Sequence, residues 1–317
     1  MKIFLFLLLF PTLCFSQSIV SEVNLLFKQK QFAKAEQIAS NYVSENPNDI
    51  DAIELLADAY GYQKKWDDAI VQYKKLVDTK KNNANFHYKY GGALGMKALE
   101  VNKFKALGII GGVKEAFLNA AELDPKHIDT RWALVELYMQ LPGIIGGSKK
   151  KSLKYANELE QLSKVDGYLA KGYIYEYGNN PELAENYYKK AIKVGGSLTC
   201  YDKLTNLYKS EKQPQKAIAT IDEAYEKHNK NHLHYQIGKV CADYNIELDK
   251  GERCLKTYIE NHSAKDGVPI EWAYYRLAQI QKHRENKQEA LKWIDKALGI
   301  RSNFKQAKEE KEKILSL

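Results

Sequence analysis

The chain has 317 residues, a formal net charge of +8 and 44% hydrophobic residues. A single hydrophobic core rarely grows beyond roughly 250 to 300 residues, so a modular or elongated arrangement fits this length better than one globular core. The 4 cysteines are too few for a disulfide-stapled scaffold, and the mild basic excess permits an acidic partner without specifying one.

The first residues have the pattern of a secretory signal peptide. An apolar stretch at residues 3–10 follows Lys2, and Ser16 is small enough to precede a cleavage site, which makes Gln17 the first mature residue. The apolar stretch is too short to span a bilayer, and no later segment is a transmembrane candidate. Residues 1–16 are therefore predicted to be a signal peptide. We expect the exported chain in the periplasm, with secretion as the alternative.

Beyond the signal peptide, small and apolar residues recur with a helical period. In the second helix of successive segments, a small residue precedes a larger apolar one by four positions, as in Ala69 with Tyr73 and Ala184 with Tyr188. The preceding helix carries a small residue of its own, such as Gly172. Because antiparallel helices cross closely only where both lack bulk, opposed small residues predict a repeated helical hairpin.

This pattern resembles the tetratricopeptide-repeat family, whose unit has about 34 residues. Residues 50–83 and 165–197 match the pattern well. The resemblance implies an all-α fold, a right-handed α-solenoid of about eight tetratricopeptide-type helical hairpins with a C-terminal capping helix. A single repeat domain is predicted at residues 17–317, with units at residues 17–49, 50–83, 84–127, 128–164, 165–197, 198–230, 231–270 and 271–304 and the capping helix at residues 305–317.

The pentapeptide Gly-Ile-Ile-Gly-Gly occurs at residues 108–112 and again at residues 143–147, a spacing of 35 residues. We expect both copies to form lengthened turns between the two helices of their units, with the first helix of the third unit ending at Gly108. Val113 and Ser152 follow at positions where the family usually has Ala or Gly. Because loops one repeat apart are neighbours, the two turns are expected to lie side by side.

Three interpretations of these paired turns are open. The isoleucines either fold back onto the long helix of the third unit or form an apolar ledge that grips a partner or touches a membrane surface. Alternatively, the glycine amides capture an anion near the lysines that follow them, although the match to a nucleotide-binding P-loop fails at Ser148. The candidate loop contacts are Ile109, Ile110, Ile144, Ile145 and Lys149.

The resemblance also implies a working surface, the concave groove lined by the first helix of each unit. Its early part would be acidic, with Asp51, Glu54 and Asp58, and its later part more basic. Aromatic side chains in the groove suit an extended peptide or a partner's helix, unless they serve only to pack neighbouring repeats. The predicted partner-binding residues are Tyr62, Tyr88, Trp132, Glu136, Tyr173, Glu176, Tyr177, Asn206, Lys209, Tyr235, Lys239, Trp272 and Tyr275. The Lys and Asn set that clamps a C-terminal carboxylate in chaperone-binding relatives is not evident.

Catalytic signatures are missing from the sequence: GxSxG, HExxH, CxxC and the dinucleotide fingerprint do not occur. We therefore expect neither an enzyme nor a cofactor. His232 and His234 would diverge on a helix, which disfavours a metal site with His228. Lysines interleaved with acids disfavour nucleic acid as a partner. Cys241 and Cys254 either form a disulfide across one hairpin or serve as small buried residues.

The sequence thus predicts an exported scaffold or adaptor that binds a protein or peptide partner. The expected setting is an envelope-associated complex in cell-envelope assembly or secretion in a Gram-negative-type cell. The alternative is a binding module for a small anionic or envelope-polymer ligand that uses the glycine-rich loops.

Overall fold

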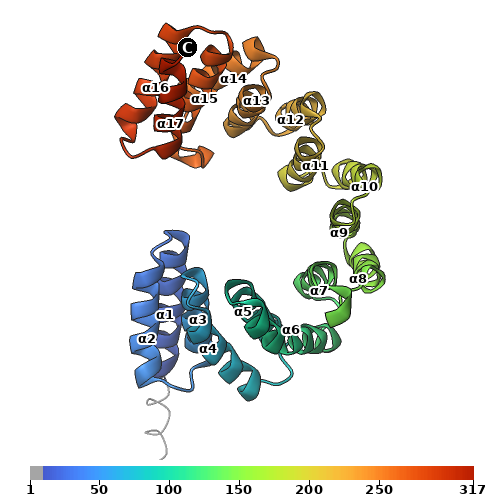
Figure 1. The fold of residues 1–317 in the computed structure, drawn as a ribbon. Helices are drawn as coiled ribbons and strands as arrows, with labels where there is room; N and C mark the ends of the chain where they lie inside the picture. Colours follow the sequence, from blue (N-terminus) through green and yellow to red (C-terminus); the bar gives the residue numbers. More distant parts are fainter. Residues whose placement is uncertain (1–9) are drawn as a thin grey trace, which may run out of the picture. The chain divides into compact units, whose positions relative to one another are not determined.

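The computed structural model describes residues 10–317 and shows an all-α protein (Figure 1). Within these residues there are seventeen α-helices, two short 3-10 helices and no strand. The chain divides into two compact units, residues 1–162 and 163–317, which we describe separately. Residues 1–9 of the predicted signal peptide lie outside the described part, and residues 10–16 lie in the first helix.

The first unit consists of four helical hairpins, and the 3-10 helix η1 lies between the two helices of the last one. Its elements are α1 (Phe10–Lys28), α2 (Phe32–Glu45), α3 (Ile50–Tyr62), α4 (Trp66–Thr79), α5 (Ala84–Glu100), α6 (Lys103–Leu123), α7 (Ile128–Gln140), η1 (Gly143–Ile145) and α8 (Lys149–Leu162).

The second unit has four further hairpins and one final helix, with the 3-10 helix η2 before the last hairpin. Its elements are α9 (Lys164–Tyr177), α10 (Pro181–Val194), α11 (Leu198–Ser210), α12 (Pro214–His228), α13 (Asn231–Tyr244), α14 (Leu248–Glu260), η2 (Ala264–Asp266), α15 (Ile270–His283), α16 (Lys287–Ile300) and α17 (Lys305–Leu315).

Within each unit, the second helix of one hairpin packs on the first helix of the next, as α4 does on α5 and α12 does on α13. Each unit is therefore a stack of helical hairpins, the arrangement of an α-solenoid, and the predicted all-α fold is confirmed. In the second unit the final helix α17 packs on α16, and its Ile314 is fully buried. Among the described residues, no helix combines the length and the apolar character needed to cross a membrane.

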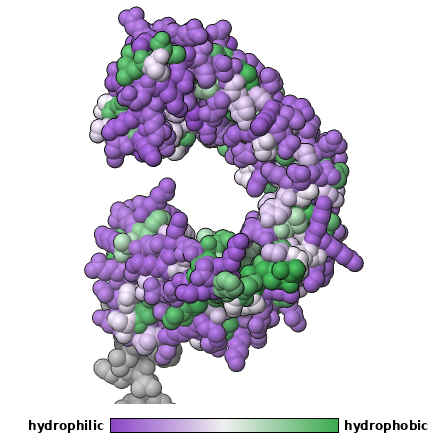
Figure 2. Space-filling model, in the orientation of Figure 1, coloured by the Kyte–Doolittle hydropathy of each residue, from purple (hydrophilic) through white to green (hydrophobic). Residues whose placement is uncertain are grey.

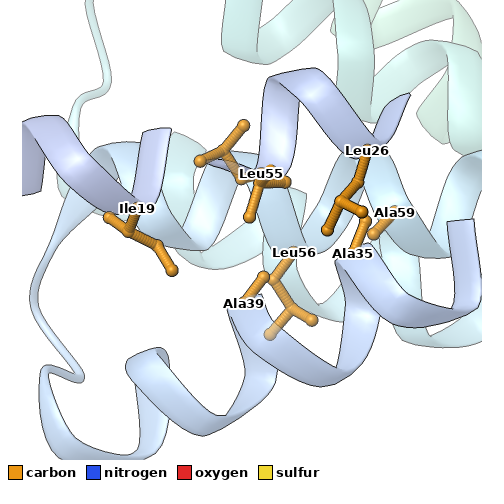
Figure 3. Close-up of a cluster of buried hydrophobic side chains, with 8 residues drawn as sticks. Ile19, Leu26, Ala35, Ala39, Leu55, Leu56 and Ala59 are labelled. Atoms are coloured by element: carbon orange, nitrogen blue, oxygen red, sulfur yellow. The ribbon is translucent and has the colours of Figure 1, made fainter. Parts of the chain in front are cut away.

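The core of the first hairpins consists of aliphatic and small side chains from three helices (Figure 3). Ile19 and Leu26 of α1 meet Ala35 and Ala39 of α2, and Leu56 of α3 joins them. Alanines at the contact let the helix backbones approach, and the larger residues fill the remaining space at core density. The same division of small and large side chains recurs along the chain.

Hairpin geometry is clearest where α9 crosses α10. A Cβ placed on Gly172 would lie 2.2 Å from Cε1 of Tyr188, so glycine is needed there to let the tyrosine ring fill the crossing. The ring is completely buried, and its hydroxyl donates a hydrogen bond to Glu176 at 2.5 Å. Gly238 and Leu255 make the equivalent contact between α13 and α14, at 2.3 Å from the added Cβ.

The third hairpin differs from the sequence prediction. Residues 108–112 do not form a turn, because α6 runs from Lys103 to Leu123 and contains them, and the first helix ends at Glu100 rather than Gly108. The additional residues lengthen both helices instead, to 17 residues in α5 and 21 in α6. Asn102 caps the start of α6 by accepting a hydrogen bond from the Lys105 amide at 3.1 Å, which sets the short turn.

The fourth hairpin has the lengthened turn that the sequence predicts. Residues 141–148 separate α7 from α8, and η1 forms part of this turn. Gly146 has φ of +102°, a conformation that residues with a Cβ rarely adopt. The second copy of the pentapeptide therefore forms the turn, whereas the first copy is helical.

At two helix crossings a larger residue stands where the family usually has Ala or Gly. The facing helix accommodates it in both cases. Val113 is buried in α6, and Gly95 of α5 lies opposite, where an added Cβ would be 3.7 Å from the valine Cγ1. Ser152 is buried in α8, and its hydroxyl donates a hydrogen bond to the carbonyl of Val135 at 2.9 Å. The crossings thus persist where the small residue of the second helix has been replaced.

Replacing Gly172 with alanine is expected to destabilise the protein by about 1–3 kcal/mol, because the new methyl group would displace the buried Tyr188 ring. The matched control is Gly299→Ala on α16, where an added Cβ would meet nothing within 4 Å. This control is expected to be neutral or to stabilise the helix by up to about 1 kcal/mol. Chemical denaturation monitored by circular dichroism measures both, and equal effects would contradict the crossing argument.

Candidate functional site

The predicted groove residues all lie on the first helices of their hairpins. They occupy α3, α5 and α7 in the first unit and α9, α11, α13 and α15 in the second. Within each unit these helices follow one another in the stack, with α5 contacting α7 and α13 contacting α15. The groove residues of the first unit and those of the second unit differ in how many of their polar and aromatic side chains remain accessible.

In the first unit the predicted aromatic residues take part in packing between repeats. Tyr62 stacks on Phe32, with ring centroids 4.8 Å apart, and also contacts Phe27. Tyr88 lies against His127, with centroids 5.2 Å apart, and is half-buried. Both rings therefore support the stack, one of the roles that the sequence left open, although part of the Tyr62 ring remains exposed.

The acidic early part of the groove is partly neutralised by a lysine that sequence reasoning missed. Lys89 of α5 lies 2.7 Å from a Glu54 oxygen and 2.8 Å from an Asp58 oxygen. Burial acts to lower the pKa of Lys89, but these carboxylates outweigh it and hold the pKa above its usual value. On α7, Trp132 is half-buried and Glu136 is exposed.

Of the two predicted groove tyrosines on α9, the first helix of the second unit, one is exposed and one is half-buried. Tyr173 and Tyr177 lie one helical turn apart with ring centroids at 5.9 Å, and Tyr177 is exposed. Glu176 accepts the hydrogen bond from Tyr188, so this predicted groove carboxylate also has a structural role. Burial, together with this bond, raises the pKa of Tyr188. The tyrosine pair is therefore the more accessible part of this helix.

Four predicted residues meet in a pocket of about 350 Å³ between α11, α12 and α13. They are Asn206 and Lys209 from α11 and Tyr235 and Lys239 from α13. The Tyr235 ring is only 7% exposed and packs on Tyr258 with centroids 5.5 Å apart, so it forms the base of the site rather than its rim. Seven residues that sequence reasoning did not assign to the groove also line this pocket, four polar and three apolar: Asp202, Thr205, His232, Gln236, Ile221, Val240 and Val268.

Positive charge is concentrated beside this pocket. Burial lowers the pKa of Lys239, and the nearby Lys209 and Arg276 lower it further, against a smaller opposing effect of Asp243. Arg276 of α15 is itself paired with Asp243 at 2.5 Å and also donates to Gln279 at 2.7 Å. The site thus holds a lysine whose charge is incompletely compensated by the protein.

Sequence reasoning missed Arg276, although it follows directly after the predicted Tyr275. Tyr275 is buried between Trp272 and Phe304, at centroid distances of 5.8 and 5.5 Å. Trp272 is half-buried and lies 4.5 Å from the Phe304 ring. On α15, Trp272 and Tyr275 therefore pack against Phe304 within the stack. Arg276 lies beside the pocket.

The residues predicted as loop contacts lie on different elements and differ in their exposure. Ile109 and Ile110 are half-buried on α6, so the expected ledge does not come from a loop at this position. Ile144 is 96% exposed in η1, whereas Ile145 is half-buried. Lys149 is exposed at the start of α8.

The geometry of the glycine amides disfavours anion capture by them. The first copy of the pentapeptide is helical, so its amides belong to the interior of α6 rather than to a loop. In the second copy the amides already donate to nearby carbonyl oxygens: Ile145 and Gly147 to Pro142, Gly146 to Gly143, and Ser148 to Tyr138, at 2.8 to 3.1 Å. A site for phosphate needs several unoccupied amides pointing at one place.

The structure also describes the surroundings of the histidines considered for a metal site and of the cysteines considered for a disulfide. His228 bonds the carbonyl of Gly196 at 2.7 Å, and His234 packs on Tyr225, so the two rings have different surroundings. Among the described residues no group of His, Cys, Asp or Glu has the arrangement of a metal site. Cys241 and Cys254 form no disulfide in this structure, and burial raises the pKa of the Cys241 thiol to about 12.

Comparison with known proteins supports the repeat assignment. The family model described as a tetratricopeptide repeat matches residues 165–194 and 273–304, which correspond to the α9–α10 and α15–α16 hairpins. The chain contains tetratricopeptide repeats. No curated protein shows significant sequence similarity to it.

Solved tetratricopeptide-repeat structures resemble the chain in fold. One from Parabacteroides merdae is 12% identical, with a TM-score of 0.50 over 94% of this chain and 98% of that one. YrrB, described as having an unusual peptide-binding site, is 20% identical, with a TM-score of 0.43 over 62% of this chain and 98% of that one. A protein from Thermus thermophilus is 15% identical, with a TM-score of 0.42 over 76% and 97% of the two chains. At these identities the likeness concerns the fold alone.

Replacing Lys239 with methionine is expected to raise the free energy of unfolding at pH 7 by up to about 1 kcal/mol after solvent screening. The folded state lowers the pKa of Lys239, so the unfolded chain binds more protons, and stability rises with pH up to the usual lysine value of about 10.4. The gain in the variant should therefore shrink as the pH approaches that value.

Denaturation at several pH values provides the measurement. Lys203→Met, at an exposed position of α11, is the control and should change stability by less than about 0.5 kcal/mol. A destabilised Lys239→Met variant would show that the lysine is compensated within the fold.

Proposed function

We propose that this protein is an interaction scaffold that binds a polypeptide partner along the first helices of its second unit. The observation that carries the proposal is the pocket between α11 and α13, which brings Lys209 and Lys239 together beside Arg276. The tetratricopeptide-repeat fold supports a role in protein–protein interaction in general terms.

Charge and shape favour a partner segment that carries an acidic side chain. A carboxylate in the pocket would compensate the charge of the half-buried Lys239, which the protein itself leaves beside Lys209 and Arg276. Asn206, with its amide, adds hydrogen-bonding capacity next to these charges. Such a charge-assisted contact gives orientation and specificity, because a neutral segment would leave the lysine uncompensated.

The tyrosines of α9 offer a second contact in the same unit. Tyr173 and Tyr177 provide rigid aromatic area with few rotatable bonds, which suits recognition of an extended chain. α9 contacts α11, so the tyrosine pair and the cationic pocket belong to neighbouring first helices. A partner peptide of several residues would reach both.

We also propose that the scaffold acts outside the cytoplasm, in an envelope-associated complex for assembly or secretion. The support is the signal-peptide pattern of residues 1–16, and the periplasm is the preferred compartment, with secretion as the alternative. The rival function, capture of a small anion or envelope polymer by the glycine-rich segments, is not favoured because their amides are already engaged.

Reversing the pocket charges with Lys209→Glu and Lys239→Glu is expected to weaken partner binding at least tenfold, since both cations would become repulsive toward an acidic segment. The tagged full-length chain is used to capture partners from the native cell envelope, and each recovered protein is then titrated against parent and variants. Lys193→Glu with Lys308→Glu, at exposed positions of the same unit, makes the same change in net charge and should bind normally.

A partner held equally by the parent and the folded pocket variant would contradict the proposed site. Loss of binding in both double variants would indicate a dependence on overall charge instead. Tyr177→Ser then separates the tyrosine contact from the pocket, because this exposed side chain can be removed without opening the core.

Export predicts cleavage between Ser16 and Gln17. Mass spectrometry of the protein purified from its native cell should find a mature amino terminus at Gln17, and fractionation should find the protein outside the cytoplasm. Replacing Ser16 with a bulky residue such as tryptophan should cause the precursor to accumulate. A cytoplasmic protein that retains Met1 would contradict the localisation.

A further inference from the structure

The end of α5 and the start of α6 carry an exposed apolar surface in the first unit. Leu99 is 71% exposed and Phe104 is 88% exposed, and Met96 and Leu107 are exposed beside them. We call these four residues the apolar patch. Figure 2 shows hydrophobic residues gathered over α5 and α6, on a surface that is otherwise mostly hydrophilic. Contiguous exposed apolar area of this kind marks an interaction site.

The apolar character continues along the exposed stripe of α6. Phe104, Leu107, Gly108 and Gly111 follow the helical spacing of one face, and all four are exposed. A helix of a water-soluble stack normally carries charged or polar residues on this face. Here the first charged residue of the stripe is Glu115, one turn beyond Gly111.

Packing does not explain the glycines of this stripe. A Cβ added to Gly108 or Gly111 would meet nothing within 4 Å, and both lie in regular helix rather than at positive φ. Glycine weakens a helix interior relative to alanine, so these positions reduce helix stability without relieving any contact. Their effect is to keep the surface between the apolar side chains low and free of bulk.

The turn after α7 carries another exposed apolar side chain. Ile144 of η1 is 96% exposed. The same turn approaches α6, because a Cβ added to Gly146 would lie 3.9 Å from Nζ of Lys114. The two copies of the pentapeptide thus belong to adjoining elements even though only one of them is a turn.

Lysines outnumber acids in the segments around the apolar patch. Residues 96–115 and 141–151 contain seven lysines and two acids, Glu100 and Glu115. The Glu100 carboxylate accepts a hydrogen bond from the Trp66 indole at 2.7 Å, and Lys97 pairs with Asp67 at 2.6 Å. Lys103 and Lys105 flank Phe104 at the start of α6, Lys114 lies further along the same helix, and residues 149–151 are three lysines at the start of α8.

We propose that the apolar patch docks on the surface of an anionic lipid bilayer, with the lysines around it contacting the headgroups. Apolar side chains buried at the level of the headgroups, together with lysines that attract anionic lipid, are the two contributions that hold a protein in the membrane interface. Long lysine side chains can reach the headgroups while the apolar centre is buried.

Vesicle sedimentation tests this docking with the mature chain. Phosphatidylcholine vesicles that contain phosphatidylglycerol are compared with pure phosphatidylcholine vesicles, at low and high salt. The double variant Leu99→Ser with Phe104→Ser should partition onto the anionic vesicles at least tenfold less than the parent. The control Val194→Ser with Ile300→Ser, which changes two exposed apolar residues of the second unit, should partition like the parent.

Charge is tested by Lys103→Glu with Lys105→Glu, which should reduce binding to the anionic vesicles at least tenfold and leave the weak binding to the neutral ones unchanged. The parent and all variants are prepared as the mature chain that begins at Gln17, and circular dichroism confirms equal melting. The proposal is overturned if the parent binds neither vesicle, if the patch variant binds like the parent, or if lipid charge has no effect. A dimer of the parent that dissociates in the patch variant would instead identify a second copy of the chain as the occupant.

Discussion

The close crossing of two antiparallel helices is the constraint on which each unit depends. Where α9 meets α10, the absence of a side chain on Gly172 leaves the space that the Tyr188 ring fills, and Gly238 does the same for Leu255. Any Cβ at these positions would overlap a buried side chain. Because this contact recurs from hairpin to hairpin, it also determines which face of each first helix is buried and which face remains available for binding.

The same constraint explains how the third hairpin tolerates its unusual sequence. Val113 adds bulk on α6, and Gly95 removes bulk on α5, so the two helices still cross. α6, with 21 residues, is the longest described helix, and α5, with 17, is longer than every other first helix except α1. The apolar residues Leu99 and Phe104 lie on these two helices.

Two lysines on first helices differ in whether the protein itself compensates their charge. Lys89 is half-buried between Asp58 and Glu54, and these carboxylates outweigh the effect of burial on its pKa. Lys239 is half-buried beside Lys209 and Arg276, and burial together with these cations lowers its pKa. The first arrangement is complete within the protein and stabilises contact between repeats. The second leaves charge uncompensated, which is the condition under which an acidic partner gains most from binding.

Periodicity alone determined the helical hairpins and the helices on which the groove residues lie, because small residues such as Ala69 and Ala184 recur at fixed spacing and local hydrogen bonding forms each helix. Tertiary structure decided what lies next to these residues. The pentapeptide shows the difference, since the same five residues are helical at 108–112 and form a turn at 143–147. Glycine and isoleucine permit both conformations, so the length of the flanking helices and the capping of α6 by Asn102 selected between them. The cationic pocket likewise required contacts between hairpins, which no spacing within one repeat specifies.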